Sequence, residues 1–227
     1  ILEHGIPEFR LDKDVLEKTI KSILNEGILD ISVEYGKELG KNLSLDGLEN
    51  KYDAIFLGFG ANIPFKMNIE GEELDGVFGG NSLLETGRHP SYTGKKVAVI
   101  GGGNVAMDCA RTIKRMGADK VFVIYRRAEK QMPAERKEIE EDKKEGIEFL
   151  FQNNIVKIIG NRKVEKVECI KTELVKKEGE TREVPVNIDG SNYELDMDYV
   201  VMAVGSSPEK DVVDSLGLEL NKWGYIK

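Results

Sequence analysis

The chain has 227 residues, of which 40% are hydrophobic and 33% charged, enough for one large domain or two small ones with buried cores. Its 33 basic and 41 acidic side chains give a net charge of −8, which argues against a general affinity for nucleic acid or anionic lipid. The apolar runs are far shorter than the roughly 20 residues that cross a bilayer, so we expect no membrane span.

The two cysteines, Cys109 and Cys169, lie far apart and match no metal-binding, redox-pair or iron–sulfur spacing. We therefore expect no metal site in this chain, and a reducing, cytoplasmic location. The chain begins Ile-Leu-Glu-His-Gly, without an initiator methionine or a leader, and we expect it to be a fragment of a longer protein.

Glycines that follow apolar, β-branched runs indicate an α/β fold. In the first part of the chain, apolar spacing and turn residues predict a helix over residues 14–26 that stops at Gly27, a short strand near 30–34, a brief helix capped by Ser44, and a buried strand over 52–57. From about residue 63 to 94, prolines and glycines interrupt every possible element, and we expect a domain connection without regular structure.

The rest of the chain carries the clearest βαβ pattern. It predicts a strand over 96–100, a helix over 105–116 ended by Gly117, a strand over 120–125, a helix over 134–145 with Pro133 in its first turn, and a strand over 147–151. Alternating charged and apolar residues over 155–188 indicate a small antiparallel meander, and the apolar run 199–204 indicates a strand buried on both faces.

Gly101, Gly103 and Ala106 have the G-x-G-x-x-A spacing of a dinucleotide-binding turn between a strand and a helix. Gly101 permits a sharp exit from the strand, Gly103 has no Cβ to block a pyrophosphate, and Ala106 lets the helix pack closely. The helix N-terminus offers amides and a partial positive charge to the phosphates. Because strand, helix and second strand flank the motif at suitable lengths, we prefer this interpretation to an ordinary turn.

Arg126 and Arg127 stand at the end of the second strand, roughly 25 residues after Gly101, where an acidic side chain binds the ribose of NAD. Two guanidinium groups favour the 2′-phosphate of NADP instead. Arg136 could supply a third contact. The alternative is that these arginines are solvated surface charge.

Other candidate residues indicate structural roles. His4 and His89 have no second histidine nearby in sequence, so we expect them at the surface or the edge of the core. Cys109 falls on the apolar side of the predicted helix, as a core residue does. Glu140 and Lys144 have helical i,i+4 spacing within a highly charged run, which predicts a solvated helix face.

Four segments resemble, in order and spacing, the small (beta) subunit of NADPH-dependent glutamate synthase and related FAD- and NAD(P)-binding oxidoreductases of the pyridine nucleotide-disulphide type: Gly5 to Leu11, Gly58 to Asn62, Gly101 to Asp108, and Tyr125 to Arg127. In that family an FAD-binding domain contains a nested NADPH-binding domain. Electrons pass from NADPH to FAD and on to iron–sulfur clusters.

The resemblance implies that the pyrophosphate is lined by Gly101, Gly102, Gly103, Asn104 and Val105, and that Arg126 and Arg127 hold the 2′-phosphate. It also implies that the crossovers between the two domains are formed by Gly58, Gly60 and Ala61 and by Ala203 and Gly205. No side chain is expected to act as a catalytic acid or base, since the cofactors carry the chemistry.

The sequence departs from the family in four ways. We do not find the cysteine-rich cluster domain, the first G-x-G-x-x-G, which receives the FAD pyrophosphate, or the C-terminal Gly-Asp element that touches the flavin, and Phe59 stands where relatives usually carry Thr. We therefore expect NADP(H) to bind this chain, with FAD and iron–sulfur clusters in the longer protein. Residues 1–78 and 207–227 are predicted to be parts of the FAD-binding domain, and residues 79–206 a Rossmann-like NADP(H)-binding domain with a central parallel sheet and a β-meander.

The predicted function is that of an NADPH-dependent flavoprotein oxidoreductase region that serves glutamate biosynthesis, with the large (alpha) glutamate synthase subunit as partner; the isolated fragment should be inactive. One alternative is the flavin subunit of a ferredoxin:NADP oxidoreductase or a sulfide dehydrogenase, with another electron-accepting subunit as partner. A second alternative is a non-catalytic nucleotide-binding module. A dithiol reductase is disfavoured because neither cysteine has a neighbouring cysteine.

Overall fold

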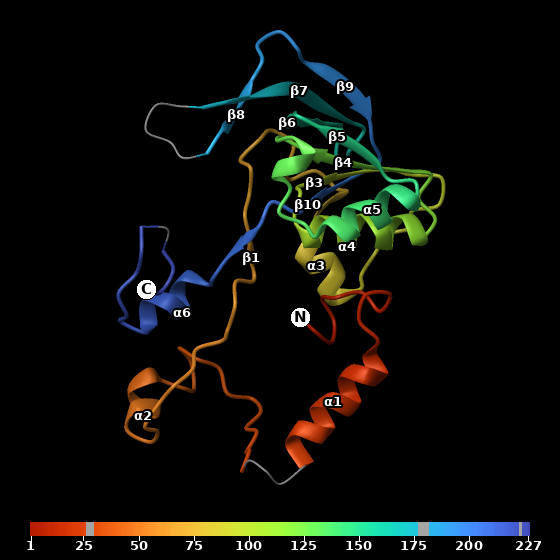
Figure 1. Ribbon diagram of the computed structural model, residues 1–227. Helices are drawn as coiled ribbons and strands as arrows, with labels where there is room; N and C mark the ends of the chain where they lie inside the picture. Colours follow the sequence, from red (N-terminus) through yellow and green to blue (C-terminus); the bar gives the residue numbers. More distant parts are fainter. Residues whose placement is uncertain (26–29, 177–181, 223) are drawn as a thin grey trace. The chain divides into compact units, whose positions relative to one another are not determined.

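The computed structural model describes residues 1–25, 30–176, 182–222 and 224–227 (Figure 1). These residues form two compact units, each assembled from two stretches of chain. The first unit comprises Ile1–Lys13 and Lys66–Gly205, and the second unit comprises Asp14–Phe65 and Ser206–Lys227. The chain therefore passes between the units after Lys13, after Phe65 and after Gly205.

A parallel sheet forms the centre of the first unit, with the strand order β2-β10-β3-β4-β5. Its strands are β2 (Val77–Gly79), β3 (Lys96–Ile100), β4 (Lys120–Tyr125), β5 (Glu148–Phe151) and β10 (Tyr199–Met202). The predicted strands that correspond to β3, β4, β5 and β10 are confirmed. From β3 the chain continues to β4 on one side of the sheet and returns as β10 on the other, which makes β3 a switch point of the topology.

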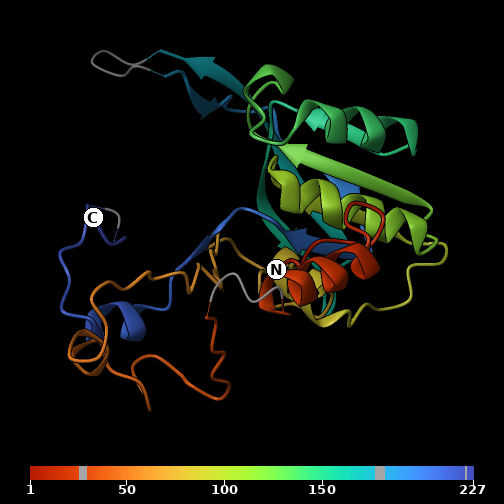
Figure 2. The same ribbon diagram turned by 60° about the horizontal axis from the view of Figure 1, so that its bottom comes forward.

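Helices cover one face of this sheet (Figures 1 and 2). They are α3 (Gly80–Thr86), α4 (Asn104–Arg115) and α5 (Arg136–Lys144), with a 3₁₀ turn, η1 (Glu129–Gln131), before α5. Alternate strand residues such as Val97, Val99 and Val121 are fully buried and pack with Met107 and Ile113 of α4. The period of two in the strands and the apolar stripe of α4 together place α4 over the middle of the sheet.

An antiparallel sheet covers the other face, and it confirms the predicted meander. It contains β6 (Asn153–Ile159), β7 (Lys166–Val175), β8 (Val184–Asn187) and β9 (Tyr193–Asp196), in the order β6-β7-β8 with β9 also paired to β7. Ala98, Ile100 and Ile124 of the parallel strands share a buried cluster with Ile155 and Val167 of this sheet. The parallel strands are therefore apolar on both faces.

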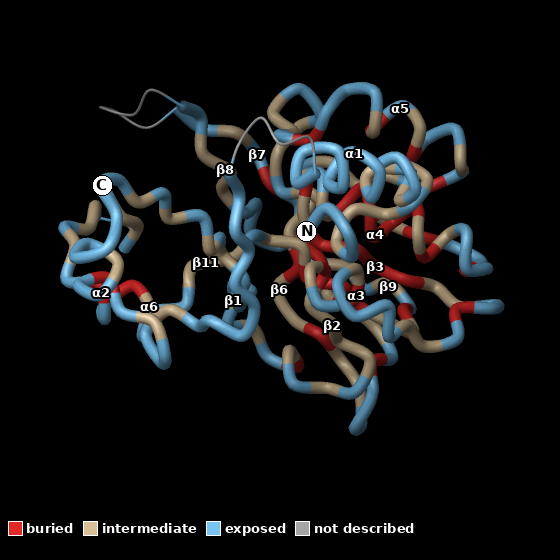
Figure 3. Tube along the Cα trace, turned by 90° about the horizontal axis from the view of Figure 1, so that it is seen from below, coloured by how far each residue is buried: buried red, intermediate tan, exposed pale blue. Residues whose placement is uncertain are grey.

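The second unit has less regular structure. It contains α1 (Lys13–Asn25), α2 (Leu45–Glu49), α6 (Lys210–Ser215) and a short antiparallel pair of β1 (Ile63–Pro64) and β11 (Ser206–Ser207). The predicted first helix and the Ser44 cap, whose Oγ accepts from the amide of Gly47, are confirmed, while the predicted stop at Gly27 lies outside the described residues. Figure 3 shows its buried positions near α2 and α6, where Leu45, Val213 and Leu216 lie.

Two strand predictions in the second unit are wrong. Residues 30–34 and 52–57 belong to no ladder among the described residues, and Phe56, predicted to be buried, is 94% exposed. An apolar run becomes a buried parallel strand only when neighbours pair with it and elements cover its faces. In the described part of this unit, β1 and β11 are the two paired strands. Residues 52–57 therefore have neither a neighbouring strand nor elements that cover their faces.

Two predictions in the first unit also need correction. The region 63–94 contains β2 and α3 as well as irregular chain, because β2 pairs with β10 and α3 packs on α4. The helix predicted from residue 134 begins instead at Arg136, since the backbone before it is bound to the glycine turn described below, and Pro133 precedes the helix. None of the helices in the described ranges is long and apolar enough to cross a membrane.

Candidate functional site

The turn between β3 and α4 requires glycine at position 101. Gly101 has a φ of +142°, and a Cβ there would lie 2.2 Å from the carbonyl oxygen of Ala203, which follows β10. A backbone atom of a central strand cannot give way as a flexible side chain can. Gly101 therefore lets β3 end directly against β10 and turn into the helix.

Gly103 is different, because nothing in the described structure demands glycine there. It is the N-cap of α4 with an ordinary φ of −92°, and a Cβ at this position would meet no atom within 4 Å. Ala106, one turn later, is fully buried against the sheet. The open space therefore lies at the start of a 12-residue helix, where backbone amides and the helix dipole favour an anion.

The arginines that follow β4 differ in their surroundings. Arg126 has an exposed side chain. Arg127 is half-buried; its Nη2 donates to the carbonyl oxygen of Glu183 at 2.9 Å, and its Nε is buried without a hydrogen-bond partner among the described residues. Arg126 is thus the more accessible cation at this end of the sheet, and Arg127 is partly engaged by the chain before β8.

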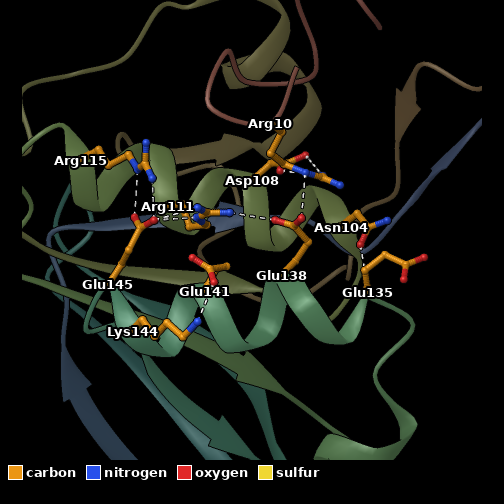
Figure 4. Close-up of polar contacts among 10 residues, drawn as sticks. All are labelled: Arg10, Asn104, Asp108, Arg111, Arg115, Glu135, Glu138, Glu141, Lys144 and Glu145. Atoms are coloured by element: carbon orange, nitrogen blue, oxygen red, sulfur yellow. Dashed lines mark hydrogen bonds and ion pairs between the residues drawn. The ribbon is translucent and has the colours of Figure 1, made fainter. Parts of the chain in front are cut away.

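Arg136 reaches the same edge of the sheet through the start of α5. The amide of Ala134 donates to the carbonyl oxygen of Gly102 at 3.1 Å, and the amide of Glu135 donates to Oδ1 of Asn104 at 2.9 Å (Figure 4). These two bonds bring the N-termini of α4 and α5 together. Arg136, the exposed first residue of α5, therefore lies at the helix end nearest the glycine turn.

The remaining predicted site residues fall into two groups. Ala203 and Gly205 follow β10 in the first unit, and the amide of Ala203 donates to the carbonyl oxygen of Ile100 at 2.8 Å. Gly58, Gly60 and Ala61 belong to the second unit, where the carbonyl oxygen of Ala61 accepts from Oγ of Ser206 at 2.7 Å. In the first unit, the glycine turn, the arginines and Ala203 therefore lie at the same edge of the parallel sheet.

The histidines and cysteines take no part in this site. Nδ1 of His89 lies 3.0 Å from the hydroxyl oxygen of Tyr92, and burial lowers the pKa of His89. Both cysteines are free and buried, as predicted for Cys109, and burial raises the pKa of Cys169 to about 12. Such thiols are poor nucleophiles.

A cluster of ion pairs between α4 and α5 was missed by the sequence analysis (Figure 4). The guanidinium of Arg111, a buried residue of α4, binds Glu138 at 2.8 Å and Glu145 at 2.9 Å, and Arg115 also binds Glu145 at 2.7 Å. The predicted solvated face is correct for Glu140 and Lys144, which are exposed. Glu138, Asp142 and Glu145, spaced by four and three residues, instead form a charged stripe facing α4, and that spacing was the available signal.

The N-terminal segment joins this cluster. Nη1 of Arg10 donates to both carboxylate oxygens of Asp108, at 2.8 and 2.9 Å, and its Nε lies 3.4 Å from Glu138. The ring of Phe9 packs on the guanidinium groups of Arg111 and Arg115, with 4.6 and 4.1 Å from guanidinium carbon to ring centroid. Sequence reasoning could not find these contacts, because 98 residues separate Arg10 from Asp108.

Asp142 is the one member of the stripe whose carboxylate makes no hydrogen bond among the described residues, although it is completely buried. Burial raises its pKa to about 8; the nearby Arg111 opposes this, while Glu145, Glu138 and Asp108 add to it. Three arginines already face three carboxylates in the cluster. A fourth negative charge would be uncompensated, so Asp142 is held as the neutral acid.

Over residues 3–227 the chain matches the family described as pyridine nucleotide-disulphide oxidoreductase. It belongs to this family. The resemblance drawn from the four sequence segments is thereby confirmed, and the chain is a member of an oxidoreductase family.

Several curated proteins are similar along all or nearly all of the chain. The NADPH-Fe(3+) oxidoreductase subunit beta of Geobacter sulfurreducens (strain DL-1 / KN400) is 35% identical over 231 residues, which cover 98% of this chain and 34% of that protein. The glutamate synthase [NADPH] small chain of Escherichia coli (strain K12) is 35% identical over 242 residues, covering 100% of this chain and 51% of that protein. The chain thus spans about a third to a half of the length of these relatives.

Solved structures confirm the fold. Mycobacterium tuberculosis FprA in complex with NADPH has a TM-score of 0.77 at 19% identity, over 98% of this chain and 64% of that chain. Thioredoxin reductase of T. acidophilum has a TM-score of 0.57 at 20% identity, over 73% of this chain and 49% of that one. The predicted α/β fold with a central parallel sheet is therefore correct.

Alanine should lower stability strongly at Gly101 and hardly at all at Gly103. Gly101→Ala should lower the free energy of unfolding by at least about 2 kcal/mol, because a Cβ collides with the Ala203 carbonyl at a positive φ. Gly103→Ala should change it by less than about 0.5 kcal/mol, because its Cβ meets open space. Urea unfolding followed by circular dichroism measures both; equal losses would contradict the assigned geometry.

Asp142→Asn, whose side chain cannot ionise, should change how the free energy of unfolding depends on pH. The pKa of Asp142 is about 8 in the folded protein and ordinarily 3.8. Between about pH 4 and 8, the folded protein therefore keeps a proton on Asp142 that the unfolded chain has released. Wild-type stability should therefore fall relative to Asp142→Asn as pH rises through that window. The slope should reach at most about 1.4 kcal/mol per pH unit, and the gap should level off above pH 8.

Unfolding curves at pH 5, 7 and 9 test this expectation. Glu140→Gln, on the exposed face of the same helix, is the matched control and should follow the wild type. A constant difference between Asp142→Asn and wild type across this range would show that Asp142 is not held protonated.

Proposed function

We propose that this chain is the NADP(H)-binding part of a flavoprotein oxidoreductase of the glutamate synthase small-chain kind, which presents NADPH for hydride transfer to a flavin. The observation that carries the proposal is the open space at Gly103 at the start of α4, with arginines at the end of the next strand. The predicted NADP(H)-binding domain, residues 79–206, falls almost wholly within the first unit.

The residues present fit an NADP dinucleotide. We infer that the glycine turn and the first amides of α4, from Gly101 to Val105, hold the pyrophosphate, and that Ala203 and Gly205 border the site. Arg126 and Arg127 would hold the 2′-phosphate, with Arg136 as a further contact. Each charge-assisted bond contributes about 1.5–3 kcal/mol, so two of them favour NADP over NAD by roughly two to four orders of magnitude. The nicotinamide supplies the hydride, and this chain binds and orients it.

The described residues do not fit a flavin in the same way. Among them, β3 and the 12-residue α4 are the one strand and helix joined by a turn with G-x-G-x-x-A spacing, and no helix directly follows Gly58, Gly60 and Ala61. We therefore assign FAD, as the family resemblance implies, to the longer protein, and propose Gly58, Gly60 and Ala61 as a crossover between domains.

The electron acceptor is proposed from the relatives. The relative in Escherichia coli, a glutamate synthase [NADPH] small chain, supports a large glutamate synthase subunit as the partner. Iron–sulfur clusters on the route from the flavin are proposed from the family resemblance alone. The NADPH-Fe(3+) oxidoreductase subunit beta of Geobacter sulfurreducens, equally similar at 35% identity, supports a second candidate in which another acceptor takes the electrons. Both candidates require the same NADPH site in the first unit.

Charge reversal at Arg126 tests the nucleotide assignment. Arg126→Glu should abolish the preference for NADPH over NADH, because a carboxylate repels the 2′-phosphate but can accept a bond from a ribose hydroxyl. Titration of each cofactor, followed by the change in NAD(P)H fluorescence, gives both dissociation constants. Arg88→Glu, an exposed arginine beyond the C-terminal end of α3, is the control; an unchanged ratio in Arg126→Glu would mean that Arg126 is only solvated surface charge.

The chain as given should bind NADPH, retain no FAD and show no turnover of its own. The physical reason is that the proposed NADP(H) residues, Gly101 to Val105 and the arginines, belong to the first unit, whereas the described residues contain no second turn with G-x-G-x-x-A spacing. Absorbance spectra of the purified chain and equilibrium binding of NADPH measure these properties. Recovery of stoichiometric FAD with the chain would refute the division of cofactors proposed here.

A further inference from the structure

We propose that Arg10 is a positioning residue for NADP(H): by bridging Asp108 of α4 and Glu138 of α5, it sets the spacing of the two helix N-termini that carry the glycine turn and Arg136. The proposal rests on the proposed function, because it concerns the same nucleotide site. Arg10 itself is not placed at the ligand. It acts through the helices that are.

The first step of the argument is the geometry of the bridge (Figure 4). Nη1 of Arg10 is bound to both oxygens of Asp108, and its Nε lies 3.4 Å from Glu138. Asp108 is in the second turn of α4 and Glu138 is in the first turn of α5. One rigid guanidinium plane therefore connects the two helices close to their N-termini.

The second step is the position of the bridge relative to the proposed ligand groups. Asn104, at the start of α4, accepts from the amide of Glu135 at 2.9 Å, and Arg136 follows directly. Glu138 lies two residues beyond Arg136, and Asp108 lies one helical turn beyond Asn104. The Asn104 bond and the Arg10 bridge thus hold the same two helix ends together from adjacent turns.

The third step is burial, which makes the bridge stiff. The side chains of Asp108, Glu138 and Arg10 are 6%, 13% and 21% exposed. A charge pair that is this far from water resists separation, because either partner alone would be left desolvated. Phe9 packs on Arg111 and Arg115, and Lys13 binds the carbonyl oxygens of Leu2 and Ile6, so the segment that carries Arg10 is itself fixed.

The chain offers a matched control in Arg115. Arg115 binds Glu145 at 2.7 Å and so joins the C-terminal ends of the same two helices by the same kind of ion pair. If ion pairs between α4 and α5 served only to hold the helices together, loss of either arginine would have similar consequences for the nucleotide. A positioning role predicts an effect confined to the N-terminal pair.

The test measures the dissociation constants of NADPH and NADH for wild type, Arg10→Met, Arg10→Lys and Arg115→Met in this chain. We expect Arg10→Met to weaken NADPH about tenfold and NADH less than threefold, because displacement of Arg136 affects mainly the 2′-phosphate. Arg10→Lys, which keeps the charge but not the fork, should fall between, and Arg115→Met should change neither constant by more than twofold. Circular dichroism confirms that each variant is folded, and Arg10→Lys carries the test where Arg10→Met does not fold.

Two results would overturn the proposal: an unchanged NADPH-to-NADH ratio in the Arg10 variants, or an equal change in Arg115→Met. The proposed function fails separately, through absence of NADPH binding by the wild type or an unaltered preference in Arg126→Glu. A wild type that prefers NADPH, with that preference lost in Arg126→Glu but kept in folded Arg10→Met, would leave the proposed function standing and reject the role of Arg10.

Discussion

The close approach of the Ala203 carbonyl oxygen to Gly101 is the constraint on which the proposed nucleotide site depends. β3 and β10 are neighbours in the parallel sheet although about 100 residues of chain separate them, and both end at the same edge. At a switch point of this kind the chain leaves in two directions, and a crevice opens beyond the strands. Only a residue without a Cβ lets β3 turn immediately at that edge, so α4 begins directly beyond the ends of the strands.

Charge, as well as apolar packing, fixes α4 and α5 relative to each other. Arg111 is buried between α4 and α5 with two carboxylate partners, and this arrangement gains little stability over an apolar one because both charges lose their hydration. The main effect of Arg111 is instead on geometry. A planar guanidinium with two carboxylate partners permits few alternative registers of α4 against α5. Keeping Asp142 neutral is part of the same balance: the cluster accommodates a fourth carboxyl group only with its proton.

The part of the fold that depends on local sequence was predictable. β3 and β4 have the predicted bounds, and α4 differs by one residue at each end, because apolar period, glycine turn and helix stop all agree within about 30 residues. Residues 52–57 have the same local character as those strands but no partners in the described ladders, and a strand is defined by its partners. The start of α5 at Arg136 was equally out of reach, because it is set by hydrogen bonds from Ala134 and Glu135 to the distant glycine turn.

In the candidate site too, the features set by local sequence were predicted and those set by distant contacts were not. The glycines, Arg126 and Arg127 were found because their spacing from a strand end has a direct chemical meaning, whereas Arg10 and the charged stripe of α5 acquire theirs only when α4 and α5 lie side by side. The sequence analysis therefore lacked information on long-range contacts. Glu138, Asp142 and Glu145 are an example, because they lie within a run of charged residues. Their spacing of four and three residues is that of a buried stripe, but in a helix with this many charged residues it is outweighed by the pattern of a solvated face.

The antiparallel sheet inserted before β10 also contributes to the site. At the end of β4 the carbonyl oxygens of Arg126 and Arg127 need partners, and they receive Oγ1 of Thr172 at 2.8 Å and the amide of Gln152 at 3.1 Å. The backbone of both arginines is thus fixed by β7 and by the turn before β6, while the Arg126 side chain stays exposed. A cation on an immobile backbone loses less conformational entropy when it binds an anion than one on a mobile loop does. The meander therefore covers the second face of the parallel sheet and also fixes the backbone of the two arginines that we propose as the phosphate ligands.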